Sequence, residues 1–178
     1  MKAHFVYEKF SEESDPIQDM GIGIKPLIEN WLKQHYIDSY KLNKDLTITV
    51  HGDLYLNDEK MEGLPFFINF YKVFGNVDLV GIGLTTLRGC PQYITGYFSC
   101  HENLLTSLEG GPKKVLTSHV NNINKHWGYK CTGNKLTSLK GLAKIIYGSI
   151  WIFKNARVFA KEEIIKKSKI YGDIVVKE

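Results

Sequence analysis

The chain has 178 residues, of which 43% are hydrophobic and 24% charged, and it carries a net charge of +4. This composition predicts one soluble globular unit with an apolar core and excludes a disordered or collagen-like chain. No apolar run approaches the ~20 residues that span a bilayer, and no signal-peptide pattern follows Met1, so we expect a cytoplasmic protein without a membrane partner. Three cysteines without C-x-x-C spacing favour reduced, buried thiols over a disulfide framework or a zinc site.

Charge is unevenly distributed along the chain. Residues 113–178 contain fourteen Lys or Arg against four Asp or Glu, whereas residues 47–112 contain three basic and seven acidic side chains. A basic block of this size could attract an anionic partner, either an acidic protein or nucleic acid. The alternative is a solvated, Lys-rich face without a binding role.

The first 45 residues predict a leader and a helix. Residues 1–24 form an acidic leader, and the shortage of apolar side chains over 8–20 indicates flexibility. Residues 25–45 form an N-terminal helical cap, because Pro26 suits a first helical turn and apolar side chains recur at helical spacing. The positions on this apolar face are Leu27, Ile28, Trp31, Leu32 and His35. We expect the face to cover the open end of a stack of repeats; a partner-binding helix is the alternative.

An internal repeat occupies residues 46–157. The segment Phe98–Leu108 matches Tyr129–Leu139 position for position in the frame apolar-x-apolar-x-x-Asn-x-Leu-x-x-Leu. Looser copies begin at Leu54, Val77 and Ile150. About ten extra residues before the fourth copy predict an insertion near 116–126. This spacing predicts a solenoid of about five coils, in which no coil buries its apolar face alone and stability comes from stacking.

Each repeat predicts a glycine turn, a short strand, an Asn corner and two inward-facing Leu. Alternate strand residues point inward, so Cys100 and Cys131 fall at buried positions that suit a small apolar side chain. A buried corner Asn, at Asn103 and Asn134, can bond backbone groups of its own turn and of the adjacent coil. The frame is broken where Glu59 and Ile82 replace Asn and where Arg157 replaces Leu. We therefore expect irregular terminal coils.

Residues 158–178 predict a C-terminal cap. The pattern favours a helix over Val158–Lys169, followed by a closing strand over Ile170–Val176. This cap would cover the second open end of the stack.

The repeat frame resembles a leucine-rich repeat, and the runs Asn103–Gly110 and Asn134–Gly141 are similar to the repeat arrays of uncharacterised tailed-bacteriophage proteins. The leader over residues 8–23 and the segment Asp45–Val50 also resemble the front end of such proteins. The resemblance implies an α/β repeat fold: a short leucine-rich-repeat-like solenoid with a parallel sheet on one face. It also implies a phage origin, and hence the cytoplasm of an infected bacterium, but no shared activity.

The sequence offers no enzyme signature. Gly21–Gly23 and Gly81–Gly83 each lack the third glycine and the strand-turn-helix context of a phosphate cradle, so they predict turns. Metal binding or thiol-imidazole chemistry is the alternative to a core role for five side chains. These are Cys100, His101, His119, His126 and Cys131. No pattern pairs two carboxylates for acid-base work, and we expect no catalysis, no metal, no cofactor and no small-molecule substrate.

Two regions predict recognition of another protein. Where strand residues alternate, one outward row and its neighbours form a sheet face with aromatic and polar side chains, which often anchor interfaces. This row comprises Tyr55, Asp78, Ser99, Lys130, Trp151 and Val175, with Tyr97, His101, Thr132 and Phe153 beside it. The second region is the insertion, with His119, Asn121, Asn122 and Trp127 as candidates. The alternatives are that Trp151 and Phe153 pack under the C-terminal helix and that the insertion is a spacer.

We expect a non-enzymatic protein-binding module, a phage product that binds a host defence or regulatory protein. The alternative is a nucleic-acid-binding protein whose lysines follow the phosphates. Its candidates are Lys113, Lys114, Lys125, Lys130, Lys135, Lys140, Lys144 and Lys154. A further alternative, an internal or structural virion component, is suggested only by the resemblance of the leader.

Overall fold

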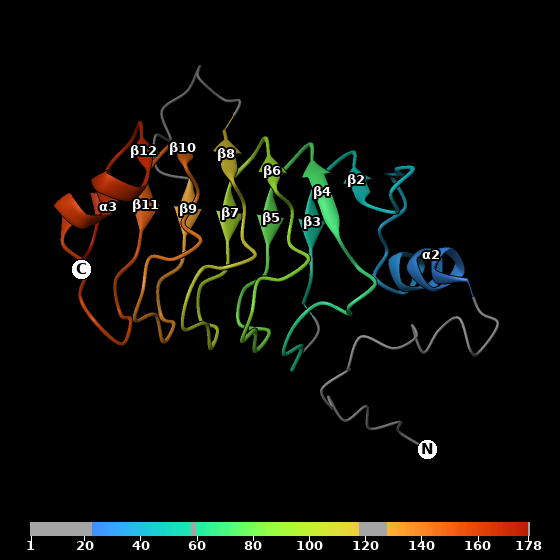
Figure 1. The fold of residues 1–178 in the computed structure, drawn as a ribbon, viewed down its shortest axis with the longest axis horizontal. Coiled ribbons are helices and arrows are strands. Elements are labelled where there is room, and N and C mark those ends of the chain that lie inside the picture. Colours follow the sequence, from blue (N-terminus) through green and yellow to red (C-terminus); the bar gives the residue numbers. More distant parts are fainter. Residues whose placement is uncertain (1–22, 58–59, 118–127, 178) are drawn as a thin grey trace.

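The computed structural model describes residues 23–57, 60–117 and 128–177. The chain coils into a β-solenoid of about five turns, whose short strands stack into two parallel sheets (Figure 1). The prediction of a repeat solenoid is confirmed. The sequence predicted one parallel sheet, whereas the structure has two, because each repeat contributes a strand on either side of its glycine. Of the predicted leader, residues 1–24, positions 1–22 lie outside the described residues, and Ile24 already begins the first described helix.

Sheet A has seven strands, in the order β1, β2, β4, β6, β8, β10 and β12. They span Tyr40–Leu42 (β1), Ile48–Val50 (β2), Phe70–Val73 (β4), Tyr93–Ile94 (β6), Lys114–Leu116 (β8), Ile145–Tyr147 (β10) and Lys169–Ile170 (β12). Sheet B has six, at Leu54–Tyr55 (β3), Val77–Asp78 (β5), Phe98–Ser99 (β7), Tyr129–Lys130 (β9), Ile150–Trp151 (β11) and Ile174–Val175 (β13). Neighbouring strands pair in parallel, except that β1 and β2 are antiparallel.

A glycine column allows the two sheets to meet at a sharp corner. In one coil, buried Ile94 ends β6 and buried Phe98 begins β7, with Gly96 between them. The Gly96 N–H donates to the carbonyl oxygen of Gly75 in the preceding coil at 2.7 Å. A Cβ atom on Gly96 would lie 2.5 Å from that oxygen. Because no side chain fits at this distance, the corner requires glycine.

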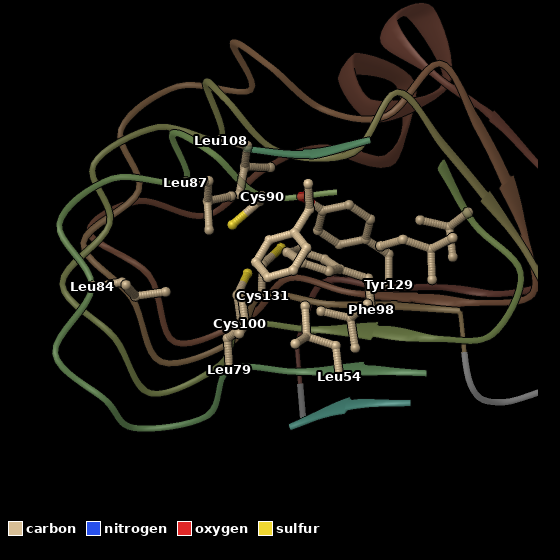
Figure 2. Packing of buried hydrophobic residues seen from close by; sticks show 14 of the residues in the cluster. Leu54, Leu79, Leu84, Leu87, Cys90, Phe98, Cys100, Leu108, Tyr129 and Cys131 are labelled. Carbon is tan, nitrogen blue, oxygen red and sulfur yellow. The ribbon is translucent and has the colours of Figure 1, made fainter. Parts of the chain in front are cut away.

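One apolar cluster fills the interior of the coil. Phe98 and Tyr129 meet edge to face with ring centroids 4.9 Å apart, and Cys100 and Cys131 are fully buried. Figure 2 shows these side chains pointing into the space enclosed by the coils, with Leu84, Leu87 and Leu108 reaching in from the side opposite the sheets. The prediction that the two thiols belong to the core is confirmed.

Buried asparagines join the coils at the corner after sheet B. The Asn134 Oδ1 accepts from the Leu105 N–H of the preceding coil at 3.1 Å, and its Nδ2 donates to the Cys100 carbonyl of that coil at 3.0 Å. The same Nδ2 lies 3.4 and 3.3 Å from the Cys131 and Thr132 carbonyls of its own turn. Asn103 and Asn155 repeat this arrangement in the coils on either side. The predicted role of the corner Asn is confirmed, and Asn155 extends it.

The corner that lacks an asparagine is completed by its neighbour. Ile82 takes the Asn position in the coil before Asn103, and its side chain is buried in the core. The Leu79 carbonyl of that coil accepts from Asn103 Nδ2 at 2.7 Å. Each Asn therefore serves the preceding coil as well as its own, so one apolar substitution is tolerated next to it. Glu59, the other predicted substitution, lies outside the described residues.

Helices lie at the two ends of the stack (Figure 1). Helix α2 (Ile24–Gln34) buries Ile28, Trp31 and Leu32, and the Trp31 ring lies 6.3 Å from that of Phe70. Helix α3 (Lys161–Lys167) is shorter than the predicted helix, and the predicted closing strand is divided into β12 and β13. Arg157 donates to the Thr137 carbonyl at 2.9 Å and pairs with Glu163 of α3, which ties the last coil to this helix. No helix in the described part of the chain has the length and apolar character needed to cross a bilayer.

Substitution of Asn134 by Ala should lower the free energy of unfolding by about 1–3 kcal/mol, because the Leu105 N–H and the corner carbonyls would be buried without partners. Urea unfolding followed by circular dichroism measures this change. The control is Asn57→Ala, since Asn57 is exposed and its substitution should cost less than about 0.5 kcal/mol. Equal stabilities of the Asn134 variant and the wild type would contradict the corner bonds.

Substitution of Gly141 by Ala should lower stability by at least about 2 kcal/mol. Gly141 has φ +84°, and an added Cβ would lie 2.2 Å from the Leu108 carbonyl oxygen of the preceding coil. A thermal melt compares this variant with Gly23→Ala, where φ is −64° and the nearest atom to the added Cβ is 3.6 Å away. The Gly23 variant should have the melting temperature of the wild type. If the Gly141 variant has that temperature too, Gly141 does not lie as close to the Leu108 carbonyl as the structure shows.

Candidate functional site

The outward face of sheet B carries the row that the repeat predicts. Strand registers align Tyr55, Asp78, Ser99, Lys130, Trp151 and Val175 across six consecutive strands. Their exposure differs along the row: Tyr55 is 53% exposed, whereas Ser99 is only 3% exposed. The face is therefore uneven, and larger side chains surround the small Ser99.

A hollow of about 300 Å³ opens on this face. We call it the sheet B hollow; it is lined by Tyr97, Phe98, Ser99, Gly128, Lys130, Trp151 and Phe153. The hollow forms because small residues lie next to large ones on neighbouring coils. Ser99 and Gly128 are small. Ser99 lies on the same coil as Tyr97, and Gly128 lies on the next coil, between the coils that carry Tyr97 and Trp151. Five of the predicted protein-binding residues meet here, and the residues that sequence reasoning missed are Phe98 and Gly128.

A short polar chain borders the sheet B hollow. His101 Nδ1 lies 2.7 Å from Ser99 Oγ, and His101 Nε2 lies 3.4 Å from the Lys130 ammonium. Because an ammonium can only donate, Nε2 accepts from Lys130 and Nδ1 carries the proton toward Ser99. Burial and the Lys130 charge lower the pKa of His101, and the nearby acidic residues Glu102 and Asp78 offset this only in part. The imidazole is therefore held neutral.

The contacts of Ser99, His101 and Lys130 are poorly suited to nucleophilic catalysis. A general base must accept the serine proton and then be stabilised as a cation, usually by a carboxylate on its other nitrogen. In this protein His101 faces Ser99 with a protonated nitrogen, and a cation, Lys130, lies on the other side. The arrangement instead fixes the direction of the Lys130 ammonium at the edge of the hollow.

Acidic groups and tyrosines lie at the other end of the row. The Tyr55 hydroxyl donates to Asp53 Oδ2 at 2.7 Å, and the Tyr97 hydroxyl lies 3.4 Å from Asp78 Oδ2. Burial raises the pKa of Tyr97, and the neighbouring Asp78 charge adds to the effect. Acidic and hydroxyl groups therefore lie near Tyr55 and Asp78, and a cation and an aromatic ring follow further along the row at Lys130 and Trp151.

Cys100 and its neighbour His101 do not form a thiol-imidazole pair, and His119 and His126 lie outside the described residues. Strand alternation turns Cys100 inward, where it is fully buried, while His101 lies outward beside Ser99. Burial raises the pKa of the Cys100 thiol well above its usual range and that of Cys90 to about 12, so both remain protonated. Over residues 23–57, 60–117 and 128–177, no three His, Cys, Asp or Glu side chains gather as a metal site would require.

The lysines expected to bind nucleic acid do not share one face. Lys114 lies in β8 of sheet A, Lys130 lies on sheet B, and Lys140 pairs with Glu109 on the side opposite the sheets at 2.8 Å. Lys113 and Lys144 immediately precede β8 and β10, and Lys135 and Lys154 lie in the turns around the asparagine corner. Lys125 and the insertion candidates His119, Asn121, Asn122, His126 and Trp127 lie outside the described residues. The described lysines are therefore spread over several sides of the coil, with Lys113, Lys114 and Lys144 together at sheet A.

Comparisons with known proteins gave no match to a protein-family model, a curated protein or a solved structure.

Replacement of Lys130 by Gln should raise the pKa of His101, because it removes the cation next to Nε2 while leaving the backbone of the row unchanged. An NMR titration of the imidazole signals measures this pKa, which should lie below 6.5 in the wild type. Since folding lowers this pKa, the unfolded chain binds the proton more readily, and the contribution of His101 to stability is lost as pH falls below about 6.5. Lys140→Gln is the control and should leave the titration unchanged; an unchanged or lower pKa in the Lys130 variant would contradict the contact.

Proposed function

We propose that this protein is a non-enzymatic protein-binding module and that the sheet B hollow is its contact site. The observation that carries this proposal is the hollow itself, in which Tyr97, Trp151 and Phe153 surround an opening beside the Lys130 ammonium. Aromatic side chains around a pocket supply much of the binding energy at protein interfaces. At about 300 Å³ the hollow has the size of the smallest ligand pockets, which suits one anchoring side chain.

The chemistry of the hollow specifies the kind of segment it would accept. An apolar side chain of the partner would enter between Trp151 and Tyr97, and a carboxylate next to it would pair with Lys130. The contact between Lys130 and neutral His101 holds the ammonium in place without neutralising its charge. A partner with an acidic residue adjacent to a large apolar residue therefore fits best.

Two further parts of this proposal concern the repeat and its source. We infer that α2 and α3 act as caps, because each buries apolar side chains against an end of the stack. The leucine-rich-repeat-like frame and its similarity to phage repeat arrays support a phage origin and a host protein in the bacterial cytoplasm as the partner. The inferences of origin and partner rest on the repeat motif Asn-x-Leu-Thr-Ser-Leu.

The proposal is tested by capture from a nuclease-treated bacterial lysate, followed by calorimetry with any protein that is retained. Trp151→Ala and Lys130→Glu should each weaken binding by about 2 kcal/mol, roughly thirtyfold. Tyr36→Ala is the matched control, because Tyr36 is 89% exposed and follows α2, outside the hollow. Retention of a partner that Trp151→Ala and Lys130→Glu leave equally tight would refute the hollow as the contact site.

A further inference from the structure

The outward face of sheet A carries a second ordered row of side chains. Strand registers align Lys72, Tyr93, Lys114, Ile145 and Lys169 across five consecutive strands from β4 to β12. The three lysines occupy alternate strands. Since neighbouring strands lie about 4.8 Å apart, successive ammonium groups start from backbone positions about 10 Å apart. The row is a ladder of cations with other side chains between them.

Exposed aromatic rings lie beside these lysines. The Tyr147 and Tyr171 rings stack with centroids 4.4 Å apart and an interplanar angle of 8°, and they are 38% and 52% exposed. Near the other end, Phe74 is 44% exposed and lies 3.9 Å from the Lys72 ammonium. The Lys169 ammonium lies 5.0 Å from the Tyr171 ring. Planar apolar surfaces and cations therefore alternate on one side of the molecule.

The charge of this face is not balanced by carboxylates. The segments 70–74, 92–95, 113–117, 144–147 and 168–171, which contain β4, β6, β8, β10 and β12 and their flanks, hold five lysines and no Asp or Glu. These lysines are Lys72, Lys113, Lys114, Lys144 and Lys169. None of them forms an ion pair with a carboxylate in the described part of the chain. The acidic residues of the coils, such as Asp78 and Glu109, lie on the other sides.

We propose that the outward face of sheet A binds single-stranded nucleic acid. Ammonium groups in a row match the regularly spaced phosphates, and exposed planar rings offer stacking surfaces for unpaired bases. Aromatic side chains on an open sheet are a general way to hold bases of single-stranded RNA. A duplex fits poorly, because its bases are not available for stacking and a broad sheet cannot enter a groove. An acidic peptide would match the lysines but would make no use of the exposed ring surface of Phe74, which stacks on His51, or of the stacked Tyr147 and Tyr171.

This surface is separate from the proposed protein-binding site. The sheet B hollow is lined by residues of β7, β9 and β11 and their flanks, whereas the lysine ladder belongs to β4, β8 and β12. Substitutions in one face therefore test one proposal without affecting the other.

The test uses the full chain and fluorescein-labelled oligothymidylate and oligouridylate of about 20 nucleotides, measured by fluorescence anisotropy. Binding of either probe, DNA or RNA, is the expected result. With three lysines on phosphates, log K should fall against log salt with a slope of about −2, or roughly fifteenfold between about 50 and 200 mM. Lys114→Gln should reduce the magnitude of this slope by about 0.7, and Tyr147→Leu should weaken binding roughly tenfold by removing one stacking surface.

Two matched controls and two further probes make the test decisive. Lys140→Gln removes a lysine that pairs with Glu109, and Tyr55→Leu removes an exposed tyrosine of sheet B; both variants should bind like the wild type. Melting curves confirm that each variant is folded, and Lys72→Gln, which removes another lysine of the ladder, replaces Lys114→Gln if that variant is not. The proposal is overturned if neither oligonucleotide binds, if Lys140→Gln weakens binding as much as Lys114→Gln, if a duplex of equal length binds as tightly, or if phosphatidylglycerol vesicles bind and the oligonucleotides do not.

Discussion

The structure depends on the need to satisfy buried backbone groups where one coil lies on the next. Strands of two to four residues supply few hydrogen bonds, so a coil cannot hold its neighbour through the sheets alone. The asparagine column supplies the missing partners. Each amide accepts a backbone N–H and donates to carbonyls of two coils, as Asn103 and Asn134 do. An apolar side chain at these positions could fill the space but could not bond those groups.

This contact fixes the register, and the register decides which side chains share a surface. With each coil held directly over the last, residues at equivalent positions form straight rows on both sheets. The sheet B hollow exists because Ser99 and Gly128 are small, while the larger side chains of Tyr97, Lys130, Trp151 and Phe153 stand around them. The lysine ladder of sheet A exists because Lys72, Lys114 and Lys169 fall at one position of alternate coils. The two faces differ in charge, so one small scaffold presents two chemically distinct surfaces.

Sequence reasoning predicted what the repeat itself encodes, because each buried position recurs along the chain. The inward Cys100 and Cys131, the bonding role of Asn134 and the outward row from Tyr55 to Trp151 all follow from alternation and spacing. The second sheet was missed, although the recurring apolar-x-Gly-x-apolar element contained its signal. A strand of two residues has no recognisable period, so the residues before each glycine were interpreted as a turn. Because sheet A was not predicted, its lysines could not be distinguished from those on other sides of the molecule.

Hydrogen exchange of the Leu84 and Leu105 amides tests the central claim, that side-chain amides at the corner hold the coils in register. Neither amide belongs to a strand; each donates to an asparagine Oδ1, at 2.9 Å from Asn103 and 3.1 Å from Asn134. The account predicts that both exchange as slowly as the Phe98 amide, which bonds between coils within sheet B. Exchange of Leu84 and Leu105 as fast as that of exposed turn amides, with Phe98 still protected, would contradict it.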